Sequence, residues 1–223
     1  MDVTLLDEPV RRYLGHAVLE HGYAARGTRL EMRGRIKVGR WLPFTATWEG
    51  NGRRFEWRAR AARGLLRVVD RFADGAGAMD VRLLGRVPLV RASDEDTTRS
   101  AAGRAAIEGA MWAPGALAAM PGVAWQAVAD DEIVATWDVP PERPAVRLWV
   151  DEHGAVRRSV VERWDDGAHG RHGYIPCGAD VHAERRFGAM VLPSRVTVGW
   201  WYGTPRFEPF FEAELLRAQP LGG

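Results

Sequence analysis

The sequence predicts a mainly antiparallel β protein of the α+β class, with about a dozen strands in one strongly curved sheet or half-barrel. Most of the chain consists of short segments that alternate polar and apolar residues, as strands with one buried face do. Turn residues separate these segments at regular intervals. Helical periodicity interrupts the series once, at residues 93–119. We therefore expect a single domain over residues 1–223, with an N-terminal helix and a central helix packed in the concave face.

The first element is an amphipathic helix predicted over residues 7–22. Pro9 falls in its first turn, where a missing N–H costs nothing. Val10, Tyr13 and Leu14 belong to one apolar face, and Gly22 is the expected end of the helix.

A first set of strands is predicted over residues 28–91. Apolar residues from Leu30 onward alternate with arginine and glutamate, and Gly50-Asn51-Gly52 turns the chain. In the next segment Phe55 and Trp57 alternate with arginines, so aromatic and basic side chains fall on opposite faces. Three shorter strands then lead into the central helix.

The central helix is predicted to begin at Ser93, because serine followed by three acidic residues suits a helix N-terminus. Alanine and glycine dominate one face, so the helix can lie close to the sheet, with Met111 and Trp112 as its large side chains. Arg104 and Glu108 are one turn apart and can interact. Pro114 with Gly115 is expected to stop the helical run.

A second set of strands is predicted over residues 123–216, beginning with a hairpin that turns at Asp130-Asp131. The glycine-rich stretch 165–180 is the least patterned part of the chain, and we expect it to form a long loop.

Composition limits the classes of partner and compartment that we expect for this protein. The net charge of +2 does not demand nucleic acid or an anionic partner, and hydrophobic residues make up 46% of the chain. The one cysteine, Cys177, excludes an intrachain disulfide and fits a reducing compartment. The N-terminus has no signal-peptide pattern, and no apolar run has membrane-spanning length. We expect a cytoplasmic protein without stable membrane insertion or a cofactor.

A resemblance adds to this interpretation. The resemblance rests on short sequence motifs that follow one another along nearly the whole chain. They are EPVRRYL, RGR…WLPFTA, LLGRVPLVRAS, MWAPGAL with GVAWQAVADDEIVAT, and ERRFGAMVLPSRVTVGWWYGT…FEPFFEAE. In these motifs the chain resembles a family of uncharacterised bacterial proteins of unknown function. The resemblance implies an architecture similar to lipoprotein carriers of the LolA and LolB type, an antiparallel half-barrel that cups helices around a hydrophobic cavity. Those carriers have a signal peptide or a lipidated cysteine, whereas this sequence has neither.

Two patterns suggest chemistry. His169, His172, Cys177 and His182 have spacings at which imidazole and thiolate could hold zinc, although we favour a flexible glycine-rich surface loop that holds no metal. Cys177 with a nearby histidine could also act as a nucleophile pair, but no elbow or carboxylate motif accompanies it. No phosphate loop, dinucleotide fingerprint or hydrolase elbow is present. The arginines near Phe55 and Trp57 would not form a nucleic-acid platform, because they face away from the aromatics.

The aromatic residues lead to the main functional hypothesis, a non-enzymatic protein that holds a hydrophobic or amphipathic, lipid-like molecule between the sheet and the central helix. Arg91 or Arg104 would meet a polar head group, and a bulky residue at Ala106 would block the ligand. Two alternatives stay open: an interaction module whose core is filled by its own side chains, and a hydrolase-like enzyme using the loop from His169 to His182. The predicted ligand-binding residues are Phe44, Trp48, Trp57, Arg91, Ala106, Met111, Trp112, Trp125 and Trp137.

Overall fold

Thirteen strands in one antiparallel sheet, with three α-helices, make up the part of the chain that the structure describes. The computed structural model describes residues 5–19, 25–167, 170 and 172–222. The strands are β1 (Gly27–Val38), β2 (Arg40–Gly50), β3 (Phe55–Ala61), β4 (Leu66–Ala73), β5 (Ala76–Leu83), β6 (Val87–Ala92), β7 (Ala124–Ala129), β8 (Glu132–Thr136), β9 (Ala145–Val150), β10 (Val156–Asp166), β11 (His172–Phe187), β12 (Met190–Trp200) and β13 (Glu208–Leu221). The helices are α1 (Glu8–Ala17), α2 (Glu95–Trp112) and α3 (Pro114–Ala119), with the 3-10 turn η3 (Ala62–Gly64) between β3 and β4.

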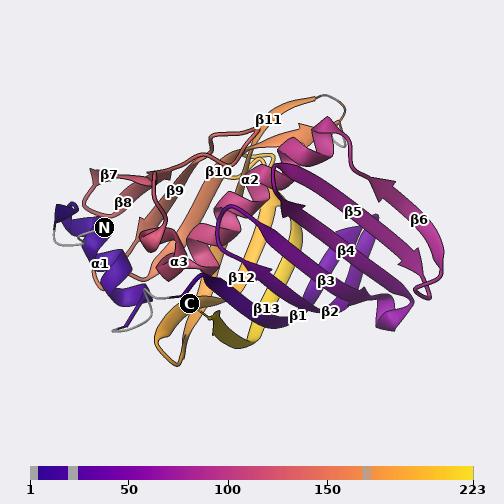
Figure 1. The fold of residues 1–223 in the computed structure, drawn as a ribbon, viewed down its shortest axis with the longest axis horizontal. Coiled ribbons are helices and arrows are strands. Elements are labelled where there is room, and N and C mark those ends of the chain that lie inside the picture. Colours follow the sequence, from indigo (N-terminus) through magenta and orange to yellow (C-terminus); the bar gives the residue numbers. More distant parts are fainter. Residues whose placement is uncertain (1–4, 20–24, 168–169, 171, 223) are drawn as a thin grey trace.

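The sheet consists of two meanders joined in the middle. Its strand order is β6-β5-β4-β3-β2-β1-β13-β12-β11-β10-β9-β8-β7, so β1 pairs with β13 and the edge strands are β6 and β7. The chain therefore passes from one edge to the other between β6 and β7, and α2 makes that crossing over the concave face (Figure 1). A helix of 18 residues is about 27 Å long, which suits this span. The predicted fold class, a curved antiparallel sheet around a central helix, is confirmed.

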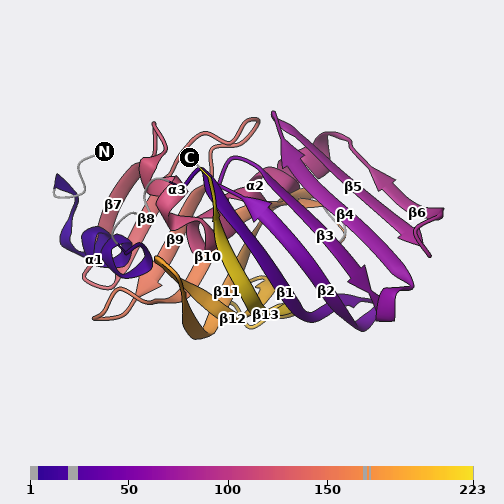
Figure 2. The ribbon, with the colours of Figure 1, turned by 60° about the horizontal axis from the view of Figure 1, so that its bottom comes forward.

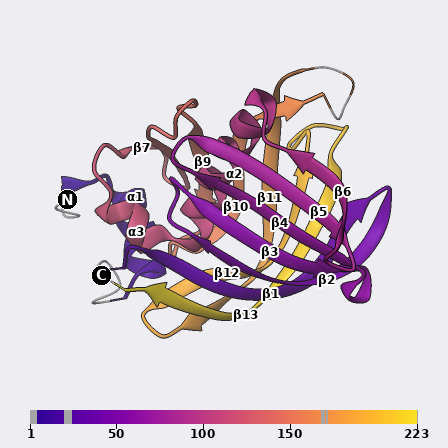
Figure 3. The same cartoon turned by 45° about the vertical axis from the view of Figure 1, so that its right-hand side comes forward.

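The core lies between α2 and the concave face. Helix α2 packs against β10 on one side and β5 on the other, and the sheet curls around it (Figures 2 and 3). The predicted alternation holds in β3, where Phe55 and Trp57 are buried and Arg58 and Arg60 are exposed. Arginines and aromatics of this strand therefore lie on opposite faces, as predicted.

Helix α2 is buried on nearly every side from Thr97 onward, not only on one face. Its small residues allow this: a Cβ on Gly109 would lie 2.2 Å from the Cα of Gly52 in the turn between β2 and β3. Helix and turn thus touch backbone to backbone. The predicted start at Ser93 is corrected by one residue, because the side chain of Asp94 caps the helix by accepting from Thr97 N at 2.7 Å.

The ends of the other helices also differ from the prediction. Helix α1 ends at Ala17, and Val18 is already extended and bridges to Met190; residues 20–22 of the predicted helix lie outside the described residues. The predicted central helix 93–119 is two helices. The run of α2 ends at Trp112, just before Pro114, as predicted, and Pro114 then begins α3, because a proline at the first helical position loses no hydrogen bond.

The loop predicted for residues 165–180 is wrong. Strands β10 and β11 continue into this stretch and pair as far as Asp166 with His172. Ladder hydrogen bonds between the two strands outweigh the weak strand propensity of the glycines, which sequence alone weighs more heavily. Among the helices of the described residues, none is long and apolar enough to cross a membrane.

Candidate functional site on the concave face

Aromatic side chains fill the space between α2 and the sheet. Trp48 of β2 meets Trp112 of α2 edge to face, with ring centroids 5.7 Å apart. Farther along the sheet, Phe44 lies 5.5 Å from Trp57 and stacks on Phe211 of β13 at 5.2 Å. All five are buried. The aromatic residues of the hypothesis thus point inward, and they pack against one another.

Three charged side chains lie in the same apolar space. Arg104 donates from Nε to Oε1 of Glu108 at 2.8 Å and from Nη1 to Oδ2 of Asp70 on β4 at 2.5 Å. The second oxygen of Glu108 accepts from Nε1 of Trp48 at 2.7 Å. The guanidinium also lies over the ring of Phe55, 4.6 Å from its centroid. Sheet and helix are therefore joined by a charge cluster with several charge-assisted hydrogen bonds.

Opposing effects set the charge state of Arg104. Burial lowers its pKa, because desolvation disfavours the charged form. The negative charges of Glu108 and Asp70 outweigh burial, so the pKa of Arg104 is raised above its ordinary value. The arginine stays protonated, and the cluster carries one more negative than positive charge when both acids are ionised.

Trp57 contributes an unused hydrogen-bond donor beside this cluster. Its Nε1 is buried and has no hydrogen-bond partner. The ring centroid lies 5.3 Å from the guanidinium of Arg104. A buried donor without a partner is costly, by about 1–3 kcal/mol. Beside α2 the concave face thus combines packed aromatic rings, a charge cluster and the free donor of Trp57.

Asp70 and Glu108 were not among the predicted site residues. The sequence held a signal for each. Asp70 shares the inward face of its strand with Leu66, Val68 and Phe72, where an acid is out of place. Glu108 stands among alanines and glycines one turn after Arg104.

The other predicted ligand-binding residues lie elsewhere or serve packing. Arg91 is on the outer face, where it faces Asp80 at 3.4 Å, so it does not reach the concave site. Trp125 is on β7 and contacts Tyr13 of α1, with centroids 5.8 Å apart. Trp137 donates to the carbonyl of Gly52 at 2.9 Å.

The remaining two predicted residues belong to α2. Met111 is buried and contacts the hydroxyl of Ser159 on β10 through its sulfur, at 3.1 Å. Ala106 is fully buried. A bulky residue at Ala106 would therefore overpack the core and destabilise the fold, which removes it as a clean test of ligand binding.

The zinc and nucleophile hypotheses meet a geometric obstacle. His172, Cys177 and His182 all lie on β11, five residues apart, which places each about 16 Å from the next along an extended strand. His172 instead pairs with Asp96 at 2.9 Å, and His182 contacts Thr197 at 2.8 Å. His169 lies outside the described residues. Among the residues that are described, no three His, Cys, Asp or Glu side chains gather as a metal site.

Cys177 itself is buried and free. Burial raises the pKa of its thiol, and the nearby Arg163 lowers it less. A thiol with a raised pKa is a poor nucleophile. Its surroundings are those of a core residue.

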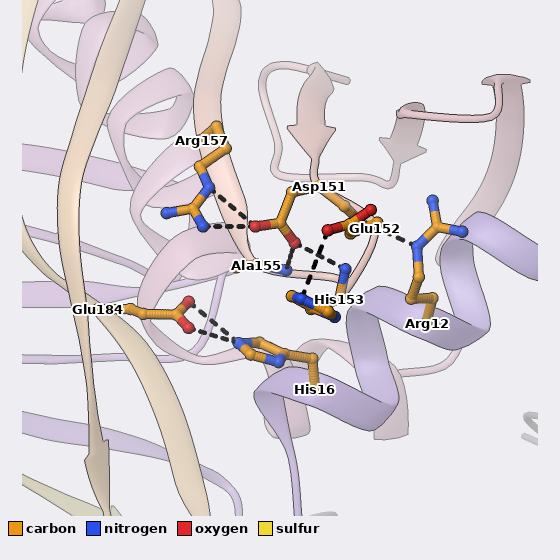
Figure 4. Close-up of polar contacts among 8 residues, drawn as sticks. All are labelled: Arg12, His16, Asp151, Glu152, His153, Ala155, Arg157 and Glu184. Atoms are coloured by element: carbon orange, nitrogen blue, oxygen red, sulfur yellow. Dashed lines mark hydrogen bonds and ion pairs between the residues drawn. The ribbon is translucent and has the colours of Figure 1, made fainter.

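A second polar cluster closes one end of the core by fixing α1 (Figure 4). Arg12 donates to the backbone oxygen of Asp151 at 3.1 Å, and His16 lies 3.0 Å from both carboxylate oxygens of Glu184. Asp151 organises the turn between β9 and β10 by accepting from the N–H groups of His153 and Ala155. Burial raises the pKa of Asp151, but these bonds and Arg157 outweigh it, so the pKa is lowered. The cluster is a docking contact for α1, and Arg12, Asp151 and Arg157 also line a surface hollow of about 510 Å³.

One solved structure shares this architecture, and two more give weaker matches. A LolA superfamily protein from Nitrosomonas europaea matches with a TM-score of 0.53 at 8% identity, over 96% of this chain and 92% of that one. A DUF1329 family protein from Desulfovibrio piger matches with a TM-score of 0.48 at 11% identity, over 92% and 93% of the two chains. A putative outer membrane lipoprotein-sorting protein domain from Vibrio parahaemolyticus gives 0.47 at 8%, over 91% and 88%. The likeness to the LolA type is thus confirmed for the fold.

Sequence comparison identifies the family. No curated protein matches the chain. The model of one family matches residues 2–213, nearly the whole chain. The protein therefore belongs to DUF6544, a family of unknown function.

Proposed function

We propose that the protein is a non-enzymatic binding protein for a hydrophobic or amphipathic, lipid-like molecule. The ligand lies between α2 and the concave face of the sheet. The observation that carries the proposal is the unpartnered Nε1 of Trp57, a buried donor on a ring that packs with Phe44 and lies 5.3 Å from the guanidinium of Arg104. A ligand acceptor that reaches this donor removes its desolvation cost.

The charge cluster limits which polar group the ligand can present to Trp57 and Arg104. Arg104 already has two carboxylate partners, Asp70 and Glu108. An additional anion would therefore meet a site whose positive charge is fully compensated. A neutral acceptor, such as an ester carbonyl or a hydroxyl, fits the free donor of Trp57 better. The apolar body of the ligand would contact Phe44 and Phe211.

Ligand entry requires a rearrangement of side chains. Trp57 is buried together with Phe44 and Phe211, so an incoming molecule must displace at least one ring. The fold match to the LolA superfamily protein supports the shape that such a role needs, a half-barrel around a helix.

Native mass spectrometry of the purified protein, followed by organic extraction, is the first test. A discrete copurifying lipid supports the proposal and names its class. Binding of Nile red, a neutral apolar dye with a carbonyl acceptor, tests the site. We expect Trp57→Phe to weaken dye binding about three- to tenfold, the worth of one hydrogen bond.

Trp125→Phe is the matched control, because Nε1 of Trp125 is also buried without a partner but lies beside α1. It should leave dye affinity unchanged. Equal effects of the two variants, together with no extracted lipid, would overturn the proposal.

A filled core favours the second candidate, an interaction module. Trp48, Trp112 and Trp137 are each at most 1% exposed. A complex with a partner protein, formed without any small molecule and unaffected by Trp57→Phe, would support this alternative.

The cytoplasm is the compartment that we propose. The support is the free thiol of Cys177, which suits a reducing environment. Cell fractionation with antibody detection tests it, and recovery in the envelope fraction would contradict it.

A further inference from the structure

An exposed apolar tip lies at the free edge of the first meander, at the lower right in Figure 1. We define the tip as residues 62–65 and 83–90, two turns joined by the hydrogen bond from Leu84 N to Leu65 O at 2.7 Å, with the start of β6. Its aliphatic side chains are 36–62% exposed. They are Leu65, Leu83, Leu84, Val87, Leu89 and Val90. So many exposed aliphatic residues in one place indicate a contact surface.

Arginines without acidic partners surround this tip. Segments 57–69 and 81–93 contain no aspartate or glutamate. Arg60, Arg63, Arg67 and Arg86 are exposed, and among the described residues no carboxylate forms an ion pair with any of them. Elsewhere on the same outer face, arginines such as Arg33 and Arg35 are paired with glutamates of β13. The tip therefore carries unpaired positive charge, unlike the paired arginines of β1.

Two of these arginines face each other directly. Arg60 and Arg67 occupy opposite positions on β3 and β4, a like-charge pair that destabilises a sheet. They border a hollow of about 660 Å³ on the outer face, whose lining has four arginines, Arg58, Arg60, Arg67 and Arg82, against two acids, Glu31 and Asp80. An anionic group seated there would relieve the repulsion.

We propose that the tip docks onto an anionic lipid bilayer. The aliphatic side chains enter the boundary between head groups and acyl chains, and the arginines contact lipid phosphates. The combination of exposed aliphatic residues with unpaired arginines separates this partner from others. A second copy would bring the same positive charges together, and Pro88 in the edge strand lacks the N–H that strand pairing needs. The inference goes beyond the proposed ligand site and does not depend on it.

Co-sedimentation with vesicles tests the docking. We expect the wild-type protein to bind vesicles of phosphatidylcholine mixed with phosphatidylglycerol, to bind pure phosphatidylcholine weakly, and to dissociate at high salt. Arg63→Gln with Arg86→Gln should weaken binding about 25-fold, since each arginine near an anionic surface contributes about fivefold. Arg143→Gln with Arg217→Gln is the matched control with the same change in net charge, and it should bind like the wild type.

The aliphatic contribution is tested separately. Leu84→Ser with Leu89→Ser should weaken vesicle binding at least tenfold, because two buried leucine side chains are lost. Val128→Ser on β7, where the valine is 50% exposed, is the control. These positions are exposed, so thermal unfolding should stay unchanged in every variant.

Three results would overturn the inference. The wild type does not bind either kind of vesicle, the tip and control variants bind equally, or light scattering shows that Leu84→Ser with Leu89→Ser dissociates a dimer that does not bind vesicles. The last result would assign the tip to a second copy of the chain. Loss of Nile red binding has no bearing on these outcomes, so the ligand site and the docking surface can fail independently.

Discussion

Gly109→Ala in α2 is expected to destabilise the protein, although alanine is the better helix former. The added Cβ would lie 2.2 Å from Cα and 2.6 Å from N of Gly52, both backbone atoms. Helix and turn must separate by about 1 Å, and overpacking of this kind costs up to about 3 kcal/mol. The higher helix propensity of alanine stabilises the folded state by about 1 kcal/mol relative to glycine. The net loss in free energy of unfolding is therefore about 2 kcal/mol.

Gly103→Ala is the matched control on the same helix. Its Cβ would meet Cγ of Arg163 at 3.0 Å, and that flexible side chain can move aside. The gain in helix propensity then remains, so stability should be unchanged or higher by up to about 1 kcal/mol.

Urea unfolding followed by tryptophan fluorescence measures both variants. A loss of about 2 kcal/mol moves the midpoint of Gly109→Ala down by about 1 M, with the slope expected for a chain of this size. If Gly109→Ala unfolds at the wild-type urea concentration or above, the close approach of α2 to Gly52 is wrong, and with it the packing that places Arg104.

Two further predictions concern titratable groups. Asp151→Asn should lower the free energy of unfolding at neutral pH by about 1–2 kcal/mol, because the lowered pKa of Asp151 means that its ionised form stabilises the fold. This stabilisation is complete above the unfolded-state pKa of about 4 and is lost as the pH falls through the folded-state pKa. Urea unfolding should therefore show the stabilities of the two proteins converging at acidic pH. A deficit that persists unchanged at low pH would contradict this assignment. Cys177, whose thiol is buried and has a raised pKa, should react with a thiol reagent such as DTNB only after unfolding in urea, and fast reaction in buffer would show that the strand opens.

Local patterns in the sequence were enough to predict the strand series, its inward faces and the position of the central helix. Alternation such as that of Phe55 and Trp57 with Arg58 and Arg60 depends only on the two-residue repeat of a strand. The same argument predicted that the inward faces are aromatic. These features need no knowledge of which strands pair.

The features that the sequence did not predict depend on pairing between segments far apart in the chain. The glycine-rich stretch after Asp165 became strand because β10 supplies hydrogen bonds to β11, which no local propensity encodes. Arg91 was predicted to bind the ligand in the concave face, but strand register places it on the opposite face with Asp80. Asp70 reaches Arg104 only because the sheet curls around α2.

The sequence by itself determined a curved antiparallel sheet with a helix inside it, since the periods of its apolar residues specify each element and its buried face. Only the tertiary structure decided what fills the concave face, because close packing between elements depends on three-dimensional register. In that register the aromatic rings close on one another, Arg104 is shared between Asp70 and Glu108, and one donor, Nε1 of Trp57, is left without a partner beside them.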